Sequence, residues 1–246
     1  MRKGVLAATP LLLAAMLLAA AGCGGSGGTT IAEPVEFDVG DNDHAVVAAF
    51  GESITAGVGS SDGAGYRGEL QRLLAAGGRP GLRVVDEGVV GSTSAAGAAR
   101  VGDVLRRQRP AALLVLYGPS DPALTELQPP LDSGAPSIVD NIRTIIEAAR
   151  ANRTLVVVST LPPVCGGGRA HQRQRTANLN EQIRGLARGM GGHDLGIVLV
   201  DAWGDFLRVS PPDGCGLLDA SGTLPTGAGY AALAGTFYGG LRYLAW

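Results

Sequence analysis

The chain has 246 residues, a formal net charge of −2 and 46% hydrophobic residues. This length suits one domain of ordinary size with a full hydrophobic core. The near-neutral charge gives no electrostatic support for nucleic-acid binding, which depends on neutralising phosphates with Lys and Arg. We therefore expect a monomeric domain with no nucleic-acid partner.

The N-terminus has the composition of an export signal. Arg2 and Lys3 form a short basic segment, and residues 5–21 are almost entirely apolar. A basic start, an apolar run and small residues before a cleavage point are typical of a secretory signal peptide. The run is also too short to be a comfortable membrane span.

Cys23 follows directly after Ala-Ala-Gly, and this junction resembles a bacterial lipobox. The resemblance implies removal of residues 1–22 and lipid attachment at Cys23, which would hold an exported protein at the extracytoplasmic side of a bacterial membrane. The Gly/Ser tract over 24–28 is typical of a flexible tether, which we place over 23–43. Two alternatives are an ordinary signal peptide followed by an unrelated cysteine, and an anchor that is never cleaved.

Two further cysteines, Cys165 and Cys215, remain in the mature chain. In an oxidising compartment an even pair can form a disulfide, although spacing alone does not establish that the two meet. Neither cysteine lies in a CxxC motif or beside a histidine at ligand spacing, so the sequence does not indicate a zinc site. We expect neither a metal nor a cofactor.

Short, continuously apolar runs alternate with longer segments of helical spacing along the chain. The predicted strands are Ala45–Phe50, Leu82–Val85, Ala112–Tyr117, Thr154–Thr160 and Gly196–Val200. The predicted helices are Tyr66–Ala76, Ala96–Arg107, Ser137–Arg150, Arg175–Met190 and Gly227–Tyr243. Strands that are apolar throughout are buried on both faces. The alternation therefore predicts one α/β domain over 44–246, with a doubly wound, mainly parallel five-stranded sheet in a three-layer, flavodoxin-like arrangement.

The loop after the first predicted strand carries the most informative residue. Ser53 lies in a glycine-flanked turn, Gly51–Gly57, directly after a buried strand. Ligands of such sheets bind at the carboxyl ends of the strands, and a serine there can present its hydroxyl beside backbone N–H groups, as a nucleophile requires. The turn contains no GxGxxG motif and is not followed by Lys-Ser/Thr, so it is neither a dinucleotide loop nor a phosphate loop.

Several segments, in order, resemble the conserved blocks of the SGNH/GDSL hydrolase family. The first is Gly51–Thr55 (GESIT), in which Glu52 replaces the usual aspartate and is interpreted as part of the loop structure. The later blocks are Asp86–Thr93, Leu116–Asp121, Val158–Pro163, Asn178–Asn180 and Gly222–Tyr230. The resemblance covers roughly residues 45–240 and implies a serine ester hydrolase on an SGNH-hydrolase-like fold.

Carried over residue by residue, the resemblance is incomplete. Ser53 matches the nucleophile, and Gly91 matches a backbone donor to the oxyanion, to which the N–H of Ser53 itself would add. The asparagine that donates to the oxyanion is replaced by Ser120, whose hydroxyl offers a weaker substitute. In the last block, Leu224 stands at the catalytic histidine and Ser221 at its aspartate. Leucine cannot accept a proton, and a serine without a base is a poor nucleophile.

Of the three histidines, only His171 is expected on the same side of the sheet as Ser53. His44 and His193 precede predicted strands and are expected at the opposite ends. His171 is therefore the candidate for a relocated base, although a solvated, charged loop is the alternative interpretation of Arg169–Arg175. In the same way, Trp203 either lines the pocket or serves in packing.

Two functional hypotheses follow from these residues. The first is an envelope-anchored esterase that hydrolyses acyl or carbohydrate esters through Ser53, Gly91, Ser120 and His171. The second is a catalytically dead member of the family that binds a small ester-like or sugar-like ligand, or acts as a scaffold. The loss of the family residues at positions 120, 221 and 224 motivates the second hypothesis. The only membrane contact expected is the lipid anchor.

Overall fold

A parallel five-stranded sheet forms the centre of the computed structural model, which describes residues 35–125, 137–241 and 244–245. Its strands are β2 (Asp43–Gly51), β3 (Arg83–Gly88), β4 (Pro110–Leu116), β5 (Leu155–Ser159) and β6 (Ile197–Val200). They are hydrogen-bonded in the order β3-β2-β4-β5-β6, and every neighbouring pair is parallel. The predicted α/β class and five-stranded parallel sheet are confirmed.

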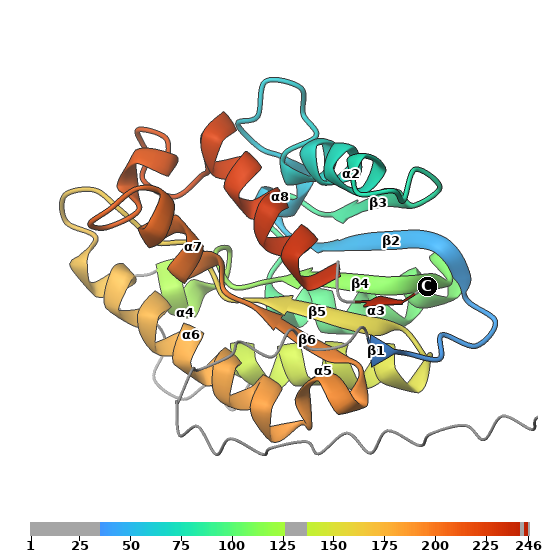
Figure 1. The fold of residues 1–246 in the computed structure, drawn as a ribbon. Coiled ribbons are helices and arrows are strands. Elements are labelled where there is room, and N and C mark those ends of the chain that lie inside the picture. Colours follow the sequence, from blue (N-terminus) through green and yellow to red (C-terminus); the bar gives the residue numbers. More distant parts are fainter. Residues whose placement is uncertain (1–34, 126–136, 242–243, 246) are drawn as a thin grey trace, which may run out of the picture. The chain divides into compact units, whose positions relative to one another are not determined.

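Helices cover both faces of this sheet (Figure 1). One face carries α2 (Tyr66–Ala76) and α8 (Gly227–Leu241), which pack on each other, with α7 (Ala202–Val209) against α8. The other face carries α3 (Ser94–Gln108), α5 (Ile138–Ala151) and α6 (Ala170–Gly189). Every residue of the central strand β4 is buried between these layers, which explains its continuously apolar sequence.

The structure differs from the predicted elements mainly at their ends. Helix α6 begins at Ala170, so the charged segment before Arg175 forms its first turns and is not a loop. Two helices of four residues follow strands, α1 (Ser53–Ala56) and α4 (Pro122–Thr125). Such short helices contain too few apolar positions to show helical periodicity in the sequence.

The predicted boundary between tether and domain moves toward the N-terminus. Strand β1 (Val35–Glu36) pairs in parallel with β7 (Leu244–Ala245), so residues assigned to the tether take part in the fold. This pairing joins the two ends of the described chain and leaves no local signal in either dipeptide. The predicted signal peptide over 1–22 and the lipidation site Cys23 lie outside the described residues. Within the described ranges, no helix combines the length and the apolar character needed to cross a membrane.

A partly buried arginine, Arg100, connects the strand ends next to the loop of Ser53. The Arg100 guanidinium donates to the carbonyl oxygens of Gly51 and Glu87 and to the Tyr117 hydroxyl, at 3.1, 2.7 and 2.6 Å. It also lies over the Phe50 ring, 4.2 Å from the ring centroid. These contacts link the ends of β2, β3 and β4, and so fix the platform from which Ser53 projects.

Candidate active site

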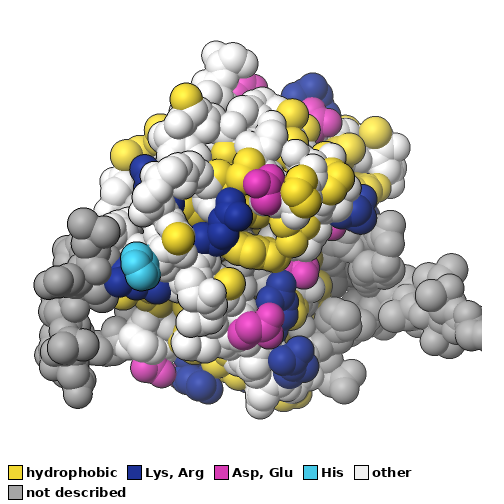
Figure 2. Space-filling view, turned by 90° about the vertical axis from the view of Figure 1, so that its left-hand side faces the viewer, with side chains coloured by type: hydrophobic (Ala, Val, Ile, Leu, Met, Phe, Trp, Pro, Cys, Tyr) yellow, Lys and Arg dark blue, Asp and Glu magenta, His cyan; other side chains and the backbone are white. Residues whose placement is uncertain are grey.

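Ser53 is the first residue of α1, which starts directly beyond the end of β2. The tight turn depends on glycine: a Cβ at Gly51 would collide with the Thr55 side chain and the Leu116 carbonyl. A Cβ at Gly88, at the end of β3, would collide with the backbone of Ala56. Helix α1 therefore lies against the carboxyl ends of the sheet, which is the edge that faces the viewer in Figure 2.

The structure brings together Ser53 and Gly91, the two residues that the resemblance assigns to nucleophile and oxyanion donor. The Gly91 N–H donates to the Ser53 Oγ at 3.1 Å. Gly91 follows β3 in a left-handed conformation, with φ of +74°, which glycine adopts without strain. Ser53 is partly exposed, so an incoming group can reach its hydroxyl.

Glu52 is a buried carboxylate directly beside the nucleophile, with 1% of its surface exposed. It caps α1, because its Oε2 accepts from the Ser53 N–H at 2.5 Å and its Oε1 from the Ile54 N–H at 3.2 Å. Its Oε2 also accepts from the Ser120 hydroxyl at 2.9 Å. Burial raises the pKa of Glu52 above its ordinary value, and the hydrogen bonds from Ser120, Ile54 and Ser53 only partly offset this effect.

These contacts change the roles expected for two oxyanion donors. The single O–H of Ser120 is directed at Glu52, so in this arrangement it is not the replacement donor that the sequence suggested. The Ser53 N–H is likewise held by the Glu52 carboxylate. Hydrogen bonds to a charged acceptor are stronger than neutral ones, so the buried carboxylate holds both donors. Gly91 is the predicted donor that remains directed at the serine oxygen.

The loop that carries Leu224 is stabilised by hydrogen bonds among its own residues. The Asp219 carboxylate accepts from the Ser221 hydroxyl at 2.5 Å and from the Leu224 N–H at 3.4 Å. Leu224 is partly buried against the core, and its Cδ1 would lie 3.8 Å from a Cβ built at Gly59, in the loop that follows α1. An apolar side chain therefore lies at the position that the sequence resemblance aligns with the catalytic histidine.

The structure does not place His171 in the site. It is exposed in the first turn of α6, whereas Arg169, Gln172 and Thr176 form the face of this segment that lines the pocket. Residues three and four apart share a helix face, and His171 lies off that face. His44 is exposed at the start of β2, at the far end of the strand from Ser53. The side chain of His193 lies outside the described part of the structure.

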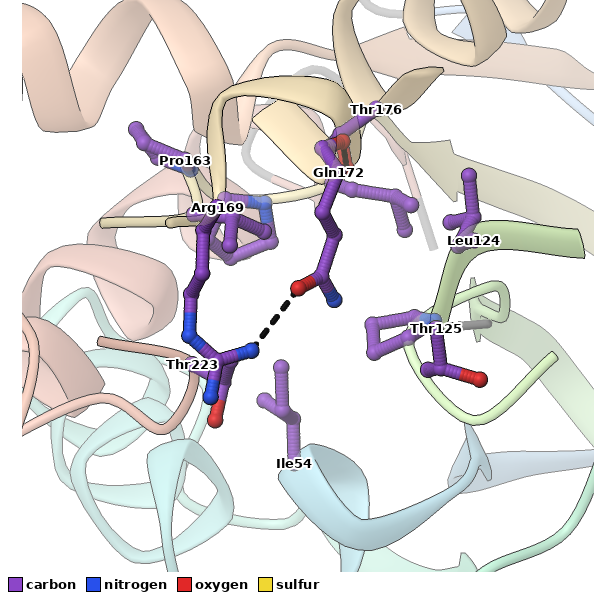
Figure 3. A pocket seen from close by; sticks show the side chains of 12 residues that line it. Ile54, Leu124, Thr125, Pro163, Arg169, Gln172, Thr176 and Thr223 are labelled. Atoms are coloured by element: carbon purple, nitrogen blue, oxygen red, sulfur yellow. Dashed lines mark hydrogen bonds between the residues drawn. The ribbon is translucent and has the colours of Figure 1, made fainter. Parts of the chain in front are cut away.

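A cavity of about 220 Å³ opens beside α1 (Figure 3). It is lined by Ile54, the residue after Ser53, and by Thr223, the residue before Leu224. The cavity therefore lies between helix α1 and the loop that carries Leu224, which we call the last loop. The other lining residues are Pro119, Leu124, Thr125, Leu161, Pro162, Pro163, Val164, Arg169, Gln172 and Thr176. Arg169 donates to the Gln172 side chain at 2.8 Å, which places a polar pair on a largely apolar wall.

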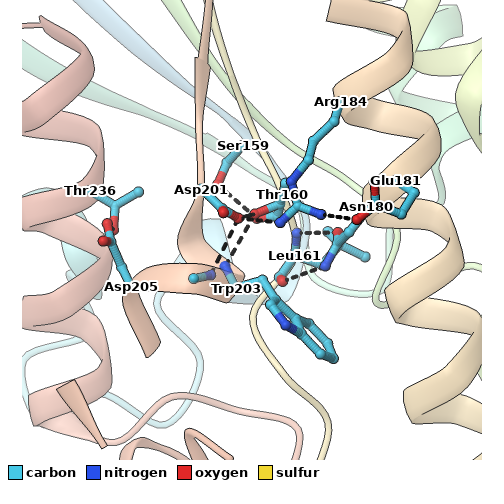
Figure 4. Close-up of polar contacts among 11 residues, drawn as sticks. Ser159, Thr160, Leu161, Asn180, Glu181, Arg184, Asp201, Trp203, Asp205 and Thr236 are labelled. Carbon is cyan, nitrogen blue, oxygen red and sulfur yellow. Dashed lines mark hydrogen bonds and ion pairs between the residues drawn. The ribbon is translucent and has the colours of Figure 1, made fainter. Parts of the chain in front are cut away.

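Residues 161–164, which follow β5, form one wall of the cavity. This wall after β5 is held in place by side chains from α6 and from the end of β6 (Figure 4). The Asn180 amide bonds both the N–H and the carbonyl oxygen of Leu161, at 2.7 and 3.0 Å. Asp201, which caps α7, accepts from Thr160 and Arg184, each at 2.7 Å. Trp203, a candidate for the pocket wall, is not among the residues that line the cavity. The backbone N–H of Trp203 donates to the Thr160 hydroxyl at 3.1 Å.

Cys165 and Cys215 form a disulfide that ties the pocket wall to the segment before the last loop. Arg173 reinforces this connection, since its guanidinium donates to the Val164 carbonyl at 2.9 Å and contacts both sulfurs. The Cys165 N–H donates to the Gly222 carbonyl at 2.8 Å. The wall after β5 and the loop of Leu224 therefore form one connected unit.

Removal of the disulfide is expected to lower stability strongly. The two cysteines are 50 residues apart in sequence, and a crosslink of that span stabilises a protein by about 4 kcal/mol, mainly by restricting the unfolded chain. The double substitution Cys165→Ser with Cys215→Ser should therefore lower the urea midpoint of unfolding. Reductant should lower the midpoint of the native chain and leave that of the double variant unchanged. Equal midpoints for the native and variant chains would contradict this prediction.

Known proteins share this fold. Residues 49–232 match the sequence profile of the GDSL-like Lipase/Acylhydrolase family. Among solved structures, an alpha/beta hydrolase enzyme, LAE5, from the metagenome of Lake Arreo in Spain is 22% identical, with a TM-score of 0.63, and the match covers 82% of this chain and 97% of that one. The acetylxylan esterase Axe2 from Geobacillus stearothermophilus is 19% identical, with a TM-score of 0.66 and coverage of 83% and 98%.

The lipase/acylhydrolase from Enterococcus faecalis is 21% identical, with a TM-score of 0.62, and the match covers 78% of this chain and 93% of that one. No curated protein matches the chain in sequence. At these identities the solved structures establish the fold alone, whereas the matched profile spans most of the sequence and includes Ser53 and Gly91. The chain belongs to the GDSL-like Lipase/Acylhydrolase family.

Proposed function

We propose that this protein hydrolyses a small acyl or carbohydrate ester, with Ser53 as the nucleophile. The observation that carries the proposal is the Gly91 N–H, 3.1 Å from the Ser53 Oγ, at the edge of the sheet beside the cavity. In acyl transfer, Ser53 would attack the ester carbonyl, and the Gly91 N–H would be at hand to stabilise the negative oxygen that forms.

The volume of the cavity supports the proposal of a small substrate. Its volume of about 220 Å³ lies below the range of about 300–1,000 Å³ that is typical of pockets for drug-sized ligands. Its apolar wall suits a short acyl group, and the Arg169–Gln172 pair offers polar contacts to a hydroxyl-rich alcohol. The acetylxylan esterase among the structural neighbours adds support for a carbohydrate ester.

The direct test of this function is turnover of p-nitrophenyl acetate by the full chain in detergent. We expect steady-state release of nitrophenol above the rate in buffer. A rate equal to that of buffer across a series of short-chain and acetylated-sugar esters would contradict the proposal.

One observation favours a second candidate, a protein that binds the same ligand without turnover. Asp219 is engaged within its own loop, and the residue that the sequence resemblance aligns with the family histidine is the partly buried Leu224. In that case acetylated sugars would raise the melting temperature of the chain without release of acetate.

We further propose that the protein is exported and lipid-anchored at Cys23. The basic start, the apolar run over 5–21 and the Ala-Ala-Gly-Cys junction support this assignment. The substitution Cys23→Ser should move the protein from the membrane fraction to the soluble extracytoplasmic fraction of a bacterial host, and the neighbouring Ser26→Ala should not. Equal retention of Cys23→Ser in the membrane fraction would contradict lipid anchoring.

A further inference from the structure

A serine nucleophile needs a group that removes its proton, and the family histidine is missing from this chain. His171 is exposed and lies off the face of α6 that lines the cavity. If the proposed ester hydrolysis holds, the acid–base group lies among the residues that contact Ser53.

The hydrogen bonds around Ser53 leave its proton available. Its Oγ accepts from the Gly91 N–H, so the hydroxyl hydrogen points elsewhere. The Glu52 carboxylate lies directly beside this hydroxyl, because its Oε2 accepts from the Ser53 N–H at 2.5 Å. Two more donors, the Ile54 N–H and the Ser120 hydroxyl, hold the carboxylate in a fixed position.

We propose that Glu52 is the general base that activates Ser53, in place of the absent histidine. A carboxylate that is adjacent to the nucleophile and fixed by its neighbours is placed to take up the hydroxyl proton, directly or through one water molecule. The usual aspartate of the family is one methylene shorter, so glutamate at this position has additional reach toward the hydroxyl of the next residue.

In this mechanism Glu52 accepts and then returns each proton that the reaction transfers. As the Ser53 Oγ bonds to the ester carbonyl carbon, its proton moves to the Glu52 carboxylate. When the tetrahedral intermediate collapses, the bond to the alcohol breaks and the Glu52 carboxylic acid protonates the departing oxygen. A water molecule then attacks the acyl-serine and gives its proton to Glu52. Release of the acid returns that proton to Ser53 and leaves Glu52 ionised again.

The surroundings of Glu52 favour this exchange of charge. The groups that stabilise its ionised form are neutral donors, and burial raises its pKa. Protonation therefore removes a poorly solvated charge at the moment when negative charge forms on the substrate oxygen. A neutral carboxylic acid also holds the Ser53 N–H and the Ser120 O–H less strongly than a carboxylate, which frees both donors for the developing oxyanion.

The decisive variant is Glu52→Gln. Glutamine has nearly the same shape and keeps one acceptor oxygen, which can take the place of Oε2 and accept from the Ser53 N–H and the Ser120 hydroxyl. Its amide nitrogen then replaces Oε1, so the hydrogen bond from the Ile54 N–H is lost, and the side chain cannot take up a proton. We expect kcat/KM for p-nitrophenyl acetate to fall by about 10²–10⁴-fold, the usual contribution of a positioned acid–base group, with a small fall in melting temperature from the lost cap hydrogen bond. Glu52→Asp keeps a carboxylate and should retain part of the activity, even if Glu52→Gln folds poorly.

The pH dependence of kcat/KM provides a second readout. The rate of the native chain should decline on acidification, as Glu52 becomes protonated, with a midpoint above the ordinary glutamate value of 4.5. The other titratable groups whose charges interact with Glu52 are Tyr66, Tyr117 and Tyr230, and burial raises the pKa of each above 10. These tyrosines cannot produce an acidic limb, and Glu52→Gln should remove it.

Asp121→Asn is the matched control. Asp121 is also buried, with 6% exposure, a raised pKa caused by burial, and hydrogen bonds from a serine, the N–H and hydroxyl of Ser94. Its substitution should leave the acidic midpoint of kcat/KM unchanged, because Ser94 is not the nucleophile.

Four outcomes separate the possibilities. Loss of turnover and of the acidic limb in Glu52→Gln, with both retained in Asp121→Asn, supports the proposal. Unchanged kcat/KM in Glu52→Gln overturns it while leaving ester hydrolysis intact. A comparable loss in His171→Ala alone would overturn it in favour of a relocated histidine. Absence of turnover in the native chain would overturn the proposed function and this inference together.

Discussion

Replacement of Ser53 by alanine is expected to reduce the hydrolysis of p-nitrophenyl acetate to the rate in buffer. The Ser53 Oγ is the atom toward which the Gly91 N–H points, and it is partly exposed beside the cavity. Without this oxygen no acyl-serine can form, and loss of a nucleophile typically costs about 10³-fold or more. Mass spectrometry adds a second measurement, because a fluorophosphonate should label the native chain at Ser53 and leave the variant unlabelled.

The control for this prediction is Ser60→Ala, which removes a hydroxyl from the loop that follows α1. Ser60 donates to the Gly57 carbonyl and accepts from the Gly65 N–H, so its role is to shape the turn. We expect its kcat/KM to stay within a few-fold of the native value. Turnover that survived in Ser53→Ala would assign the activity to another residue or to a contaminant.

Introducing histidine and aspartate at the two positions that the sequence resemblance aligns with the catalytic pair is expected to produce the second largest change. The double substitution Leu224→His with Ser221→Asp should raise kcat/KM for small esters by about 10²-fold. Thr223 and Ile54 line the same cavity, so the loop of Leu224 borders the helix that presents Ser53. A histidine is the better base near neutral pH, since its pKa of about 6.5 lies close to that of the medium. The gain is at the lower end for an acid–base group because Glu52 already supplies part of the effect.

The same double variant also tests how the base is replaced. With histidine at position 224, the additional substitution Glu52→Gln should cost far less than in the native chain. In a Ser53→Ala background the double substitution should bring no gain. If the pair leaves kcat/KM unchanged while the chain keeps its melting temperature, the last loop does not reach the nucleophile, and the correspondence of Leu224 to the family histidine is wrong.

Much of the fold follows from local patterns in the sequence. Strand β4 is apolar throughout and β5 is apolar up to Val158, because both of their faces are covered, and a buried strand leaves that signature in consecutive residues. Helix α2 was predicted with its observed bounds, Tyr66–Ala76. Ser53 could be singled out because it lies in a glycine turn after a buried strand, at the edge where such sheets bind their ligands. Gly91 could be identified only through the resemblance of its segment to a block of the family.

The fold class, the succession of strands and helices along the chain, and the turn of Ser53 are thus encoded in local stretches of sequence. Other features depend on how the layers pack, and they became visible only in the folded chain. They are the pairing of β1 with β7, the closure of the disulfide, and the start of α6 at Ala170, which leaves His171 exposed. The largest difference between the predicted and the observed site concerns Glu52, which accepts hydrogen bonds from the Ser53 N–H and the Ser120 hydroxyl. Its burial, and with it the acid–base role proposed for it, arises from packing that no local pattern encodes.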